Sequence, residues 1–76
     1  MNKKLSELRP GQHAVIREVN SHEIHLKLLE MGCQPGETIS VEQIAPLGDP
    51  VSVQVAGYRL SLRLDEAAHI VVDVID

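Results

Sequence analysis

The chain has 76 residues, a formal net charge of −4 and one cysteine, which together predict a single small domain over residues 1–76 without an internal disulfide. Seven scattered basic residues and one aromatic residue, Tyr58, disfavour nucleic-acid binding, which needs cations for phosphates and rings for stacking. No apolar run approaches the ~20 residues of a membrane-spanning helix, and no signal-peptide pattern follows Met1, so we expect a cytoplasmic protein with no direct membrane insertion.

The N-terminal segment favours a helical turn followed by a strand. Leu5 and Leu8 lie three residues apart, as they would on one turn of helix laid over the end of a core. The tripeptide Arg-Pro-Gly at residues 9–11 is typical of a turn. Residues 12–19 then predict a first strand, whose inward face is ambiguous because apolar residues occupy both phases of the alternation.

A helix is predicted from Asn20 to Met31. The Asn20 side chain can cap its first turn, and Glu23, three residues later, supplies the partner of a capping box. Gly32 stands where a left-handed residue would end the helix, and Pro35-Gly36 prevents its continuation. The helix is therefore expected to be short and bounded at both ends.

A second strand is predicted over residues 37–45, after the Pro-Gly turn. Ile39 and Val41 share one face, but Ile44 falls out of phase with them, which indicates a bulge near residues 42–43. Residues 46–50 contain two prolines and a glycine and predict a loop.

The clearest pattern in the chain is a hairpin that turns at residues 56–57. Apolar residues alternate with polar ones on both arms, and one register places them all on the same face, pairing Val55 with Tyr58, Val53 with Leu60 and Val51 with Leu62. A short helical turn over residues 66–68, capped by Asp65, and a last strand from Ile70 to Val74 complete the prediction.

These elements predict a mainly β fold with five short strands and one α-helix inserted between the first and second strands. A sheet this small with one apolar face must pack on another element or curl closed, and closure also removes exposed edges. We therefore expect a small five-stranded SH3-like barrel in which the helix forms a lid or projection.

Four ordered motifs resemble one protein family. They are Leu-Arg-Pro-Gly at 8–11, Glu-Met-Gly-Cys-Gln-Pro-Gly at 30–36, Ala-Pro-Leu-Gly-Asp-Pro at 45–50 and Gly-Tyr-Arg-Leu-Ser-Leu-Arg at 57–63. In this order and spacing they are similar to FeoA, the cytosolic accessory protein of bacterial ferrous iron transport. Cys33 stands where the family usually has an aliphatic residue.

The resemblance implies an SH3-like barrel that binds and modulates FeoB, a membrane iron transporter with a cytosolic GTPase domain. The chain has no phosphate-cradling Gly-x-x-x-x-Gly-Lys sequence and no catalytic triad, so we expect a non-enzymatic protein without a cofactor. Two alternatives stay open: a stand-alone interaction module with another partner, and a transition-metal sensor or carrier.

The predicted helix carries more apolar residues than one buried face needs. Ile24, Leu28 and Met31 fall within one stripe, which we expect to face the core, whereas Leu26 and Leu29 fall on the far side. Those two leucines are either incidental surface residues or a ridge that docks a partner. The candidate partner-binding residues are Leu26, Lys27, Leu29, Glu30, Cys33 and Gln34.

Metal binding has weak support from the sequence. His22 and His25 lie three residues apart on the predicted helix, and Cys33 follows its end, so these three side chains could suit zinc. Two histidines and one distant cysteine are more often a solvated helix start and a small buried thiol. We therefore predict no metal site and keep His22, His25 and Cys33 as minor candidates.

Overall fold

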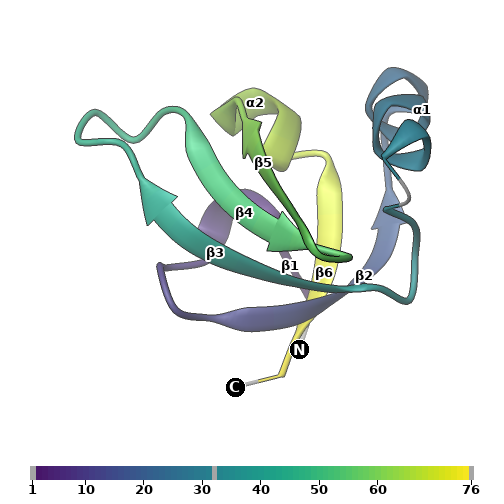
Figure 1. The fold of residues 1–76 in the computed structure, drawn as a ribbon, viewed down its shortest axis with the longest axis horizontal. Helices are drawn as coiled ribbons and strands as arrows, with labels where there is room; N and C mark the ends of the chain where they lie inside the picture. Colours follow the sequence, from purple (N-terminus) through teal and green to yellow (C-terminus); the bar gives the residue numbers. More distant parts are fainter. Residues whose placement is uncertain (1, 32, 76) are drawn as a thin grey trace.

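The structure, a computed structural model, describes residues 2–31 and 33–75. Within these two segments, six strands, two α-helices and one 3-10 helix follow one another along the chain (Figure 1). Their bounds are β1 Asn2–Lys4, η1 Leu5–Glu7, β2 His13–Val19, α1 His22–Glu30, β3 Thr38–Ile44, β4 Val51–Val55, β5 Tyr58–Leu62, α2 Leu64–Ala67 and β6 Ile70–Val74.

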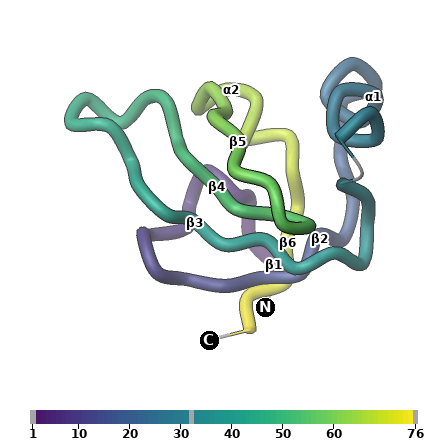
Figure 2. The backbone as a smooth tube through the Cα atoms, viewed as in Figure 1, coloured from purple at the N-terminus to yellow at the C-terminus, as the bar shows by residue number. Residues whose placement is uncertain are grey.

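All six strands belong to one antiparallel sheet in the order β1-β6-β2-β3-β4-β5. The predicted count of five strands is wrong because β1 was missed, and α1 therefore lies between the second and third strands. Among the described residues the sheet is not a closed barrel, since β1 and β5 remain its two edges. The molecule measures 28 × 23 × 22 Å, and the strands of its one sheet curve around the buried aliphatic side chains (Figure 1). The sheet is thus strongly bent around its core (Figure 2).

Strand register follows the burial of alternate side chains. The predicted hairpin pairing of β4 with β5 is confirmed in all three apolar pairs, from Val55 with Tyr58 to Val51 with Leu62. The register of β3 against β4 shifts between Val41 and Gln43, which confirms the predicted bulge. Tyr58 remains 57% exposed because it lies on the edge strand β5, beside the turn.

A second register shift explains why the inward face of β2 could not be chosen from the sequence. Ala14 and Ile16 are buried, and the pairing of β2 with β6 then shifts between Ile16 and Glu18. The shift breaks the period-two alternation, so that Val19 packs against the core although it is out of phase with a regular strand.

The core consists of branched aliphatic side chains and small residues, and no polar side chain among the described residues is buried within it. The predicted N-terminal helical turn is present as η1, and Leu5 and Leu8 both pack into the core. The largest fully buried side chains are Leu5, Ile16, Leu28, Ile39, Leu62 and Ile70.

Both helices begin one or two residues away from the predicted position. Ser21 rather than Asn20 is the N-cap of α1, since its Oγ accepts a hydrogen bond from the Ile24 N–H at 3.5 Å. Helix α2 begins at Leu64 rather than at residue 66, after Arg63 as its N-cap residue. The predicted helix end at Gly32 lies outside the described residues.

Candidate functional site

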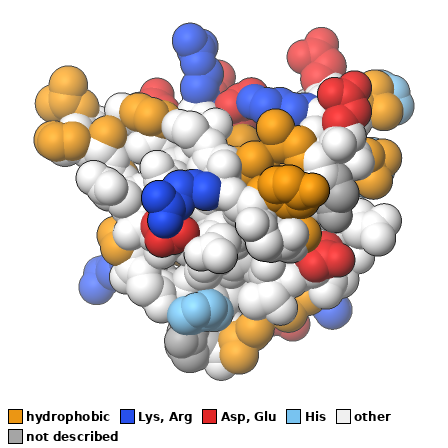
Figure 3. Space-filling view, in the orientation of Figure 1, with side chains coloured by type: hydrophobic (Ala, Val, Ile, Leu, Met, Phe, Trp, Pro, Cys, Tyr) orange, Lys and Arg blue, Asp and Glu red, His pale blue; other side chains and the backbone are white. Residues whose placement is uncertain are grey.

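Helix α1 stands at one end of the long axis of the molecule and presents an apolar outer face (Figure 1). Ile24 and Leu28 point inward and are 8% and 1% exposed, whereas Leu26 and Leu29 are 46% and 42% exposed. Met31, expected in the buried stripe, is instead 39% exposed at the C-cap. Figure 3 shows hydrophobic side chains at this end of the molecule. We call the exposed Leu26 and Leu29, with their polar neighbours Lys27, Glu30 and Gln34, the α1 docking face.

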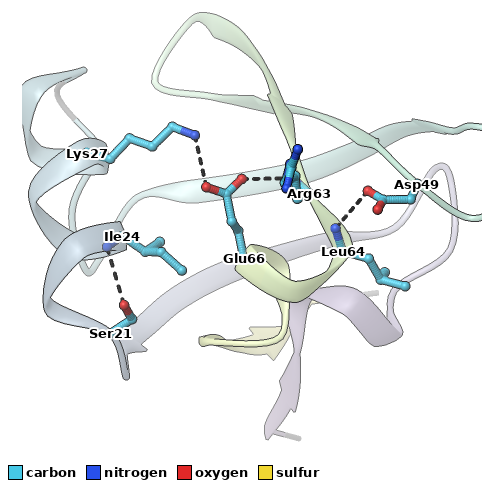
Figure 4. A network of polar contacts seen from close by, with 7 residues as sticks. All are labelled: Ser21, Ile24, Lys27, Asp49, Arg63, Leu64 and Glu66. Atoms are coloured by element: carbon cyan, nitrogen blue, oxygen red, sulfur yellow. Dashed lines mark hydrogen bonds and ion pairs between the residues drawn. The ribbon is translucent and has the colours of Figure 1, made fainter.

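The polar members of this face are also at the surface. Lys27, Glu30 and Gln34 are exposed, and the Lys27 Nζ lies 3.2 Å from Oε2 of Glu66 in α2. That ion pair joins two helices that are 39 positions apart in the sequence. The Lys27 side chain thus points toward α2 (Figure 4).

Cys33 differs from the other candidate partner-binding residues because its side chain is buried, with 1% exposed. Its N–H donates to the Leu28 carbonyl at 2.8 Å, which caps the last turn of α1. Burial raises the pKa of the Cys33 thiol, and the nearby Glu37 carboxylate raises it further. A neutral buried thiol packs as a small apolar group, so Cys33 offers no side-chain surface to a partner.

Helix α2 lies at the centre of a polar network that reaches α1 and the β3–β4 loop (Figure 4). One carboxylate oxygen of Glu66 accepts the Arg63 N–H at 2.9 Å and the other binds Lys27. The Arg63 N–H and then the Lys27 ammonium hold the pKa of Glu66 below its usual range. The Asp49 carboxylate accepts the Leu64 N–H at 2.9 Å. Sequence reasoning missed this network because it joins residues from three distant segments.

The candidate metal ligands do not converge. His22 and His25 line an open cleft of about 390 Å³ together with Glu18, whereas Cys33 is buried in the core. Among the described residues, no three His, Cys, Asp or Glu side chains are grouped closely enough to hold a metal ion.

A second open cleft, of about 310 Å³, lies between the start of α1 and α2. Its lining is mostly polar and charged: Ser21, Glu23, Ile24, Arg63, Asp65, Glu66 and His69. The Ser21 hydroxyl serves as the α1 N-cap, and the Glu66 carboxylate is held by Arg63 and Lys27. Both groups are thus engaged in holding the helices in place.

No helix in the described part of the chain combines the length and the apolar character needed to cross a bilayer.

Comparison with known proteins gives a family assignment. The FeoA domain family matches residues 3–74. A fusion protein of Porphyromonas gingivalis, described as Fe(2+) transport protein A joined to Fe(2+) transporter FeoB, is 47% identical over 73 residues. The match covers 95% of this chain but only 9% of the fusion protein.

Solved structures agree with this assignment. Iron(II) transport protein A of Clostridium thermocellum superimposes with a TM-score of 0.88 and 44% identity, covering 96% of this chain and 46% of that protein. FeoA of Stenotrophomonas maltophilia, described as a prokaryotic SH3 domain protein and solved with zinc, gives a TM-score of 0.79 and 36% identity, covering 96% and 89%. The bent antiparallel sheet is accordingly SH3-like, and the chain belongs to the FeoA family.

Proposed function

We propose that this chain is a non-enzymatic accessory protein of ferrous iron uptake, which acts in the cytoplasm by binding the cytosolic portion of a FeoB-type membrane GTPase. Membership of the FeoA family supports the iron-transport role. The fusion relative supports the choice of partner, since it carries a sequence like this one in the same polypeptide as a FeoB transporter.

The observation that carries the proposal is the surplus apolar surface of α1. Helix α1 reaches the core through Ile24 and Leu28, whereas Leu26 and Leu29 stay 46% and 42% exposed. Burying one leucine side chain contributes on the order of 1.5–3 kcal/mol, so two would anchor a transient contact. Lys27, Glu30 and Gln34 surround them with polar groups, as in the rim of a protein interface.

Binding at this face would modulate the transporter only through a difference in affinity between its states. A partner that binds the GTP-loaded and GDP-loaded forms equally well shifts neither population. A tenfold preference for one form corresponds to about 1.4 kcal/mol, which is less than the contribution of one buried leucine. A leucine of the α1 docking face that is buried against one form and exposed beside the other supplies that preference.

The test measures binding of the full chain to the cognate transporter in lipid nanodiscs, with GTP or with GDP. Leu26→Asp is expected to leave the circular dichroism spectrum intact and to weaken binding by at least about tenfold, because it places a charge in the apolar contact. Ile75→Asp is the matched control, since Ile75 is 59% exposed and lies outside the α1 docking face. A folded Leu26→Asp variant that binds like the unmodified chain would contradict the proposal.

A further inference from the structure

We draw no further inference here: the strongest candidate, the apolar surface patch that the exposed Leu47 forms on the loop between β3 and β4 (Figure 1), carries none because nothing in the structure shows what covers it.

Discussion

Two leucines of α1, two positions apart, should respond very differently to truncation. Leu28 is 1% exposed, so Leu28→Ala leaves a cavity in the core and should cost about 2–5 kcal/mol of unfolding free energy. A domain of this length has a total stability of about 4–11 kcal/mol, so the loss is a large fraction of it. Leu26 is 46% exposed, and alanine favours a helix, so Leu26→Ala should cost less than about 0.5 kcal/mol.

Urea unfolding followed by far-UV circular dichroism measures both values, since the chain has no tryptophan and one tyrosine for fluorescence. With a slope of about 1 kcal/mol per M for a small domain, Leu28→Ala should lower the midpoint by about 2 M or more. Leu26→Ala should shift it by less than about 0.5 M. If the two variants lost similar stability, Leu26 would pack within the monomer, and the argument that α1 has a spare apolar face would be refuted.

The polar network, the thiol and the loop give four further predictions. The pKa of Glu66 is lowered in the folded chain, so its carboxylate stabilises the fold at pH values above its unfolded pKa of about 4.3. This contribution is lost as the pH falls through the lower pKa of the folded chain. In urea titrations, the difference in unfolding free energy between the unmodified chain and Glu66→Gln should therefore shrink on acidification. The Cys33 thiol should react with Ellman's reagent far more slowly in the native chain than in urea, and equal rates would contradict its burial. Gly48→Ala should lose about 1 kcal/mol of unfolding free energy in urea titrations, because its φ of +88° is strained for alanine, while no atom outside residues 47–49 lies within 4 Å of the added Cβ. Lys27→Ala should lose no more than about 1 kcal/mol of unfolding free energy, since its ion pair with Glu66 is at the surface. The loss should be smaller at high salt, which screens the pair.

Sequence patterns predicted the sheet best where one face is buried. The alternation in residues 51–62 determines the β4–β5 register, because a slip by one residue would expose every valine. The bulge after Val41 was visible because Ile44 is out of phase. Strand β1 was missed because Asn2–Lys4 has no apolar pattern, although it pairs antiparallel with β6. The N-cap was misplaced by one residue because Asn20 and Ser21 are both good capping residues, and only the backbone geometry distinguishes them.

The site was predictable only in part, for a related reason. Helical periodicity separates Leu26 and Leu29 from Ile24 and Leu28, so the exposed face of α1 follows from spacing alone. Periodicity does not apply to the Ala45–Pro50 loop, whose rigidity depends on the contact of Asp49 with Leu64, fifteen positions away. Contacts between distant segments depend on the assembled fold, which no local pattern encodes.

The ion pair between Lys27 and Glu66 bears on how the α1 docking face works. Lys27 was a candidate contact residue, but its ammonium lies 3.2 Å from Glu66 and links α1 to α2, while Ile24 and Leu28 are the helix residues that reach the core. If Lys27 acts by positioning α1, Lys27→Ala and Glu66→Gln should weaken transporter binding equally, because each substitution removes the same link. The double variant should then bind no more weakly than either single variant. If Lys27 instead contacts the transporter, Lys27→Ala should weaken binding while Glu66→Gln leaves it unchanged or improves it. A positioning role also predicts that salt weakens binding of the unmodified chain, because salt screens the Lys27–Glu66 pair. Salt should have less effect on Glu66→Gln, since the leucines of this face are apolar.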